Sequence, residues 1–118
     1  MDAGIRVSWG AVRIGKEKKA LELFQDAVTY YGKKMADGKV TYFEPFIVGT
    51  GDQSVETGFF IVKGPLTEIF AIYDEKTFKE LNTKAYLLLD HFKVDFLTVG
   101  EEIEAQLKRY EQTLAYVG

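Results

Sequence analysis

A single histidine is the first candidate for chemistry in this chain. His91 is the only histidine among 118 residues, and the sequence contains no cysteine. A lone histidine can shuttle a proton or ligate a haem iron. The residue counts exclude multi-histidine metal sites and thiolate chemistry. His91 is therefore the one candidate catalytic residue. Its structural interpretation is a residue at the end of a helix, where a cation meets the last carbonyl groups.

Four further residues are candidates for binding a ligand. Trp9, the only tryptophan, could stack on a planar ligand or fill the core. Tyr42 and Glu44 share one face of a predicted strand, and Arg13 lies where another strand ends, so these three could orient a polar ligand. Surface charge and protection of an edge strand explain Glu44 and Arg13 equally well.

Residues 10–17, GAVRIGKE, nearly match the phosphate-binding pattern GxxxxGK[ST] between a predicted strand and helix. The last position of that pattern needs a hydroxyl to hold magnesium, and Glu17 would place a negative charge there instead. Val12 and Ile14 suit a continuing strand better than an anion-binding loop. We therefore predict no nucleotide site here. No clustered carboxylates indicate a metal site either.

Hydrophobic periodicity predicts the elements that must position these residues. Alternating or β-branched runs predict strands over residues 5–12, 40–48, 55–62 and 94–99. Apolar residues at helical spacing predict helices over 16–35 and 66–73, a longer helix capped by Asp74 that runs through His91, and a last helix that begins at Glu101. The order is therefore β-α-β-β-α-β with an additional C-terminal helix.

This order predicts one α+β domain over residues 1–118, with a ferredoxin-like four-stranded antiparallel sheet. In that arrangement the first and third strands are central, and the second and fourth are edges. Pro45 lies inside the second predicted strand. Because proline cannot donate a hydrogen bond to a neighbouring strand, its position agrees with an edge.

Both faces of the predicted strands are largely apolar, as where Phe59 and Ile61 alternate with Phe60 and Val62. One chain has helices enough to cover mainly one face, and soluble monomers rarely expose a large apolar surface. We predict a homodimer with two-fold symmetry through the sheet face and the C-terminal helix. A C-terminal helix that folds over its own sheet is the alternative. That helix carries an apolar seam of Ile103, Leu107, Tyr110 and Leu114.

Two segments carry a resemblance to a known superfamily. Residues 12–22, VRIGKEKKALE, resemble the strand-to-helix junction of uncharacterised bacterial members of the dimeric α+β barrel superfamily, and residues 58–64, GFFIVKG, resemble their third strand. The resemblance implies two ferredoxin-like subunits that join sheets into a barrel with a pocket. The superfamily includes cofactor-independent monooxygenases of the antibiotic-biosynthesis type, haem-degrading enzymes, dye-decolourising peroxidases and stress-responsive proteins. No catalytic motif of these families matches, so no catalytic residue is carried over.

The composition of the chain restricts the kinds of partner that it could bind. The net charge of −3 provides no general field that would attract nucleic acid. No apolar run is long enough to span a bilayer, and the first residues lack the pattern of a signal peptide. We expect a cytoplasmic protein whose partners are a second copy and a small molecule, without a resident cofactor.

The leading functional hypothesis is a small-ligand-binding protein, since aromatic residues make up 14% of the chain and could line a pocket. One alternative is a cofactor-independent monooxygenase for an aromatic substrate, with His91 or Arg13 holding the deprotonated substrate. A second alternative is haem binding through His91. Whether the protein is an enzyme stays open at this point.

Overall fold

The computed structural model describes residues 1–118 in eight elements that form one sheet and a helical layer. They are β1 (Asp2–Trp9), α1 (Glu17–Ala36), β2 (Tyr42–Ile47), β3 (Gly58–Pro65), α2 (Leu66–Asp74), α3 (Lys76–Leu88), β4 (Lys93–Thr98) and α4 (Glu101–Val117). The strands pair antiparallel in the order β2-β3-β1-β4. This is the predicted ferredoxin-like arrangement, with β1 and β3 in the centre.

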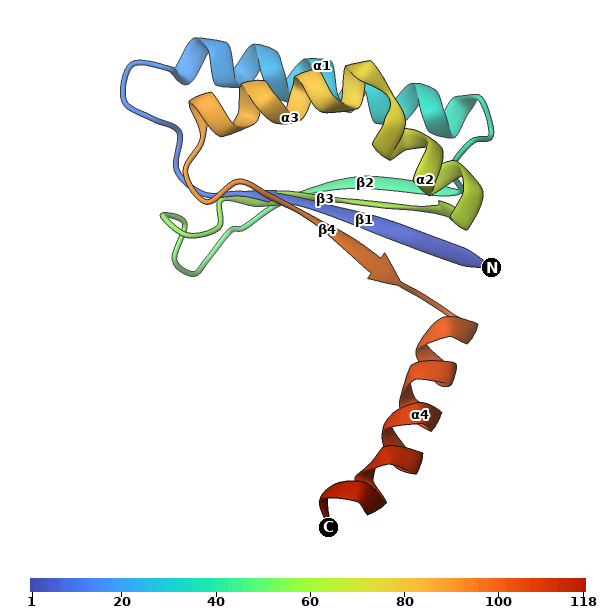
Figure 1. Ribbon diagram of the computed structural model, residues 1–118. Helices are drawn as coiled ribbons and strands as arrows, with labels where there is room; N and C mark the ends of the chain where they lie inside the picture. The colour runs from blue at the N-terminus through green and yellow to red at the C-terminus, as the bar shows by residue number, and fades with distance from the viewer.

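The helices α1 and α3 lie side by side over one face of the sheet, and α2 packs at one end of the same face (Figure 1). Strand alternation decides which side chains meet this layer. On β1 the buried apolar residues are Ala3, Ile5, Val7 and Trp9, and on β3 they are Phe60 and Val62. The core therefore lies between the sheet and the helices, on what we call the helix face.

The edge position of the second strand is confirmed. β2 pairs only with β3, and Pro45 lies opposite Phe60 in that register. The backbone N–H that Pro45 lacks therefore interrupts no hydrogen bond between the central strands. β4 forms the other edge beside β1.

The first strand lies three residues earlier than predicted, at Asp2–Trp9 instead of 5–12. Gly10 ends it, because there the chain meets two other loops. The Gly10 amide donates to the Asp90 carbonyl at 2.7 Å, and the Ala11 amide donates to the Ser54 carbonyl at 3.3 Å. Val12 makes only an isolated bridge to Leu89. Residues 10–12 thus belong to a loop despite their alternating pattern, because contacts with distant segments replace hydrogen bonding to a neighbouring strand.

The third strand is also shifted, from the predicted 55–62 to Gly58–Pro65. The Asp52 carboxylate accepts hydrogen bonds from the amide and hydroxyl of Ser54, and the Val55 amide donates to the Asp52 carbonyl at 3.2 Å. These bonds hold Val55 in a turn. Apart from α3, the remaining strand and helix ends lie within two residues of the prediction.

The prediction that Asp74 caps a helix running through His91 is wrong. Asp74 is the last residue of α2, and Glu75 has extended backbone angles, φ −74° and ψ 137°, between α2 and α3. α3 ends at Leu88. His91 lies in the following turn with φ 55°, in the left-handed region that few non-glycine residues adopt.

The opposite face of the sheet, which we call the open face, is uncovered within one chain and is less uniformly apolar than predicted. Register places Phe46 beside Phe59, with ring centroids 4.9 Å apart, while Arg6 lies over the Phe59 ring at 4.6 Å. Charged side chains share this face, namely Lys63 on β3 and Glu44, Lys93 and Asp95 on the edge strands. The face therefore combines an aromatic pair with several charged side chains.

α4 does not fold over its own sheet. It projects away from the open face (Figure 1), and none of its residues is buried. The apolar seam is exposed within one chain, with Leu107 at 59% and Tyr110 at 66%. The projection contributes to a radius of gyration of 16.5 Å, whereas a compact domain of this length has about 13.5 Å. No helix of the chain combines the length and apolar character that a membrane span requires.

Candidate functional site

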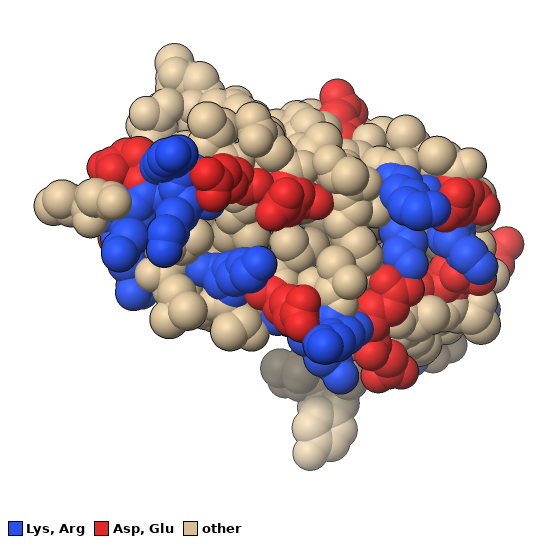
Figure 2. Space-filling view, turned by 90° about the horizontal axis from the view of Figure 1, so that it is seen from above, with Lys and Arg blue, Asp and Glu red and all other residues tan.

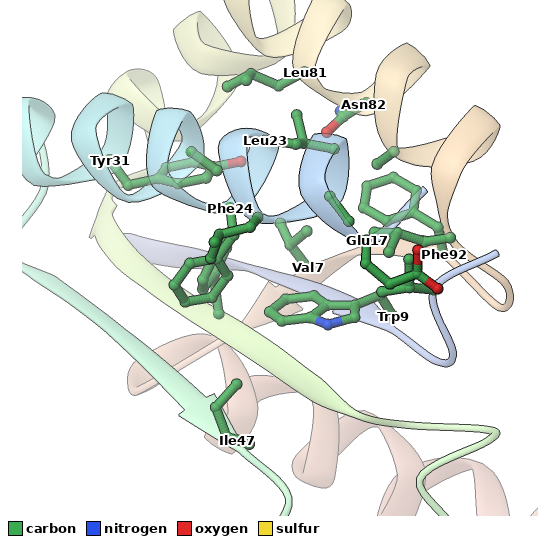
Figure 3. A pocket seen from close by; sticks show the side chains of 17 residues that line it. Val7, Trp9, Glu17, Leu23, Phe24, Tyr31, Ile47, Leu81, Asn82 and Phe92 are labelled. Carbon is green, nitrogen blue, oxygen red and sulfur yellow. The ribbon is translucent and has the colours of Figure 1, made fainter. Parts of the chain in front are cut away.

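A cavity of about 430 Å³ lies between the helical layer and the sheet. Its walls come from α1, α3, β1 and β3, with Ile47 at the end of β2 (Figure 3). Hydrophobic residues make up 15 of its 17 lining residues. We call this space the helix-side cavity.

The aromatic wall of the helix-side cavity follows from strand alternation and helical spacing. Trp9 on β1 and Phe60 on β3 both point toward the helices, and their rings meet edge to face with centroids 5.0 Å apart. Phe24 on α1 meets the Trp9 ring edge to face at 6.0 Å. Such edge-to-face contacts hold rings in defined orientations. The rings therefore form a preformed surface along one side of the cavity (Figure 3).

Small residues on the helices leave the space open. Ala20 and Ala27 on α1 and Ala85 on α3 all line the helix-side cavity. Ala27 and Ala85 are buried, at positions where a larger aliphatic side chain would extend into the cavity. Protein interiors normally leave no void larger than a water molecule. The placement of alanine at these facing positions is thus what maintains the cavity.

Four polar groups belong to the helix-side cavity: the Trp9 indole N–H, the Tyr31 hydroxyl, the Asn82 amide and the Glu17 carboxylate. Tyr31 is buried, and burial raises the pKa of its phenol far above the usual value. Tyr31 is therefore a neutral hydroxyl at physiological pH. Glu17, the only carboxylate in the lining, lies at the exposed start of α1.

The five residues predicted to bind ligand are not brought together. Trp9 alone lines the helix-side cavity. Arg13 is exposed and pairs with Asp90, Nε to Oδ1 at 3.3 Å. Tyr42 donates a hydrogen bond to Glu44 on the open face of the edge strand. His91 lines a second hollow, and none of the other four predicted residues lines it. Within one chain, Tyr42 and Glu44 therefore lie together, and Arg13 lies beside Asp90 instead.

The second hollow, of about 470 Å³, lies at the end of the open face where β1 ends and β4 begins. We call it the polar hollow. Its lining includes Arg6, Ser8, Glu56, His91 and Lys93. Arg6 forms an ion pair with Glu56, and the Ser8 hydroxyl is buried without a hydrogen-bond partner. No group of three metal-ligating side chains occurs in the chain.

Sequence reasoning missed most residues of both spaces. The facing alanines are visible in the helical stripes, but a stripe does not reveal which residues it faces. Arg6 and Ser8 had a clearer signal, since they are polar residues on the outward face of an otherwise apolar central strand. Figure 2 shows positive and negative side chains interspersed over the helical face, so no charged patch there marks a further site.

Comparison with known proteins identifies the fold. No protein-family model matches the chain, and no curated protein matches it significantly. Among solved structures, the chain is similar to a dimeric protein of unknown function with a ferredoxin-like fold from Bacteroides fragilis. The TM-score is 0.60 at 6% identity, over 83% of this chain and 96% of that one.

Two further structures agree. A Dabb family protein with a ferredoxin-like fold from Mesorhizobium loti has a TM-score of 0.60 at 10% identity, over 85% of this chain and 100% of that one. A proposed antibiotic biosynthesis monooxygenase from Deinococcus radiodurans has a TM-score of 0.58 at 10% identity, over 85% and 93%. The ferredoxin-like fold and the antibiotic biosynthesis monooxygenase among these structures agree with the resemblance found in the sequence. Identities this low show the shared fold alone.

Proposed function

We propose, from a fold shared with dimeric α+β barrel proteins, that this chain binds one small, flat, apolar molecule in the helix-side cavity. The observation that carries the proposal is a cavity of about 430 Å³ with 15 hydrophobic residues among 17. Known ligand pockets measure about 300–1,000 Å³ and combine an apolar lining with a few polar groups. Both conditions are met.

The lining favours an aromatic ligand with one polar substituent. The Trp9, Phe24 and Phe60 rings offer flat apolar surface at fixed angles. Three lining residues on the helices carry polar groups, namely the Tyr31 hydroxyl, the Asn82 amide and the Glu17 carboxylate. The Tyr31 hydroxyl and the Asn82 amide can each form a hydrogen bond with a ligand hydroxyl or carbonyl. An anionic ligand is disfavoured, because the lining contains no cation to compensate its charge.

The geometry favours binding over the two alternatives from sequence. His91 and Arg13 are both absent from the lining of the helix-side cavity. Neither can therefore hold a deprotonated substrate there, as the monooxygenase hypothesis required. For the same reason His91 cannot ligate a haem that occupies the cavity. A cytoplasmic location stays a prediction from the sequence.

Isothermal titration calorimetry with 2-naphthol tests the proposal. Ala85→Leu fills part of the cavity, and Ala71→Leu adds the same atoms at an exposed position on α2. We expect saturable binding to the wild type and to Ala71→Leu. Ala85→Leu should raise the dissociation constant at least tenfold, which corresponds to about 1.4 kcal/mol of binding free energy. Equal binding to all three proteins, or none to the wild type, would contradict a site in the helix-side cavity.

The second part of the proposal is that two copies pair through the open face and α4. A 17-residue helix without buried residues has marginal stability in water by itself. Its apolar seam is exposed in one chain, and the Phe46–Phe59 pair on the open face is only half-buried. The similar protein from Bacteroides fragilis is described as dimeric. A second copy would cover both surfaces at once.

Light scattering after size exclusion tests the pairing. We expect about 27 kDa, twice the 13.4 kDa of one chain. Leu107→Glu in the α4 seam should yield monomers, whereas Leu87→Glu on α3, with Leu87 similarly exposed at 65%, should remain dimeric. Phe59→Asp on the open face should also separate the copies. A wild-type monomer at micromolar concentration would contradict the pairing.

A further inference from the structure

The Ser8 hydroxyl is the most unusual group in the polar hollow. Ser8 is 2% exposed, lies in the central strand β1, and its Oγ has no hydrogen-bond partner. Buried hydroxyl groups in folded proteins nearly always have a partner, because leaving one unpaired is costly. Ser8 lines the polar hollow, so a molecule in that hollow can supply the missing partner.

The other polar groups of the hollow are mostly donors. Arg6 and Lys93 can only donate hydrogen bonds, and His91 adds an imidazole. Glu56 is the only carboxylate in the lining, and Arg6 already engages it. Lys93 also forms an ion pair with Asp95, which lies outside the lining, at 3.6 Å with side chains 62% and 42% exposed. The lining itself therefore carries two cationic side chains against one carboxylate, and that carboxylate is already engaged.

The walls of the hollow are held in place by backbone contacts. The Gly10 amide donates to the Asp90 carbonyl, and the Thr57 amide donates to the Trp9 carbonyl, both at 2.7 Å. These bonds join the end of β1 to the two loops that carry Glu56 and His91. His91 is held in a left-handed conformation, φ 55°, of a kind that is concentrated at functional sites. The backbone that carries Glu56 and His91 is thus fixed relative to the end of β1.

We propose that the polar hollow binds a small oxyanion, the carboxylate or phosphate group of a small molecule. An anionic oxygen would accept hydrogen bonds from the Ser8 hydroxyl, the Lys93 ammonium and the His91 imidazole. The hollow lies at the end of the sheet opposite to the strand end that leads into α4, since Ser8 pairs with Lys93 while Ala3 pairs with Thr98. This site lies on the opposite side of the sheet from the helix-side cavity, and Phe92 is the one lining residue that the two spaces share.

The chain offers a separate reporter for each site, because His91 is its only histidine and Trp9 its only tryptophan. We would follow the His91 ring protons by NMR at fixed pH and constant ionic strength during titration with sodium phosphate and, separately, sodium acetate. We expect a saturable shift with a dissociation constant of about 1 mM or below for one probe. Tighter binding of phosphate indicates that the ligand group is a phosphate, and tighter binding of acetate indicates a carboxylate. Trp9 emission should stay constant, whereas 2-naphthol should change it and leave His91 unaffected.

Matched variants locate the site. Ser8→Ala and Lys93→Gln should each weaken binding of the probe at least fivefold. Thr29→Ala on α1 and Lys79→Gln on α3, which remove the same groups at exposed positions, should bind as the wild type does. A shift that sodium chloride reproduces indicates an adventitious ion only and overturns the proposal. So does unchanged affinity in Ser8→Ala and Lys93→Gln while their spectra show a folded protein.

Discussion

The same chemical change at two glycines is expected to have opposite effects on stability. Gly10→Ala should lower the free energy of unfolding by about 3 kcal/mol, whereas Gly32→Ala should raise it by about 0.5–1 kcal/mol. Neither glycine has a positive φ, so the difference comes from the surroundings of the added methyl group.

At Gly10 the added Cβ would meet the backbone on three sides. It would lie 2.4 Å from the Ser54 carbonyl oxygen, 2.8 Å from that of Val55 and 3.1 Å from that of Asp90. These oxygens cannot move without shifting both loops. Such overpacking costs about 1–3 kcal/mol, and loss of the Gly10–Asp90 backbone hydrogen bond adds about 1–3 kcal/mol. The sum supports a loss of about 3 kcal/mol.

At Gly32 the added Cβ would meet no atom within 4 Å. Gly32 lies inside α1, where glycine loses more backbone entropy on folding than alanine does. Alanine in a helix interior is therefore more stable by about 0.5–1 kcal/mol.

Thermal unfolding followed by circular dichroism measures both effects. With about 2.1 cal/mol/K per residue, the entropy of unfolding of 118 residues is about 0.25 kcal/mol/K. The melting temperature should fall by about 12 °C for Gly10→Ala and rise by about 2–4 °C for Gly32→Ala. All proteins are compared at one concentration, because pairing would stabilise them. A Gly10→Ala protein within about 1 kcal/mol of the wild type would refute the convergence of three segments at Gly10.

Three further predictions concern buried polar groups. Ser8→Ala removes an unpaired hydroxyl and should raise the free energy of unfolding in urea by about 1 kcal/mol; a decrease would mean that the hydroxyl has a partner. Burial alone would raise the pKa of Glu75, but hydrogen bonds from Lys34 and Tyr30 lower it below its usual value. Glu75→Gln should therefore reduce the melting temperature at pH 7, and its difference from the wild type should shrink as pH falls through the folded-state pKa; a difference that persists at pH 2 would contradict this. Burial raises the pKa of Tyr31 far above 10, so stability should decline as pH rises beyond about 10, the value in the unfolded chain. Absorbance at 295 nm that shows all seven tyrosines ionising before unfolding would disprove it.

The sequence by itself determined the order and type of the elements and the faces of the central strands. Alternation over Ile5, Val7 and Trp9 placed these residues on one side of β1, and Pro45 marked β2 as an edge strand. Periodicity could do this because it depends on the local geometry of the backbone, which repeats every 2 or 3.6 residues. The β-α-β-β-α-β order, as a ferredoxin-like arrangement, also predicted the sheet order that the structure shows.

Only the tertiary structure decided which surfaces meet. β1 ends before Gly10 because distant loops converge there. His91 lies in the turn after α3 and lines the same hollow as Ser8. The helix-side cavity arises where alanines of two helices lie opposite Trp9 on the helix face of the sheet. A periodic pattern in the sequence indicates which residues share one face of a strand or helix. The partner of that face depends on strand register and on contacts between residues far apart in the chain, which no local pattern encodes.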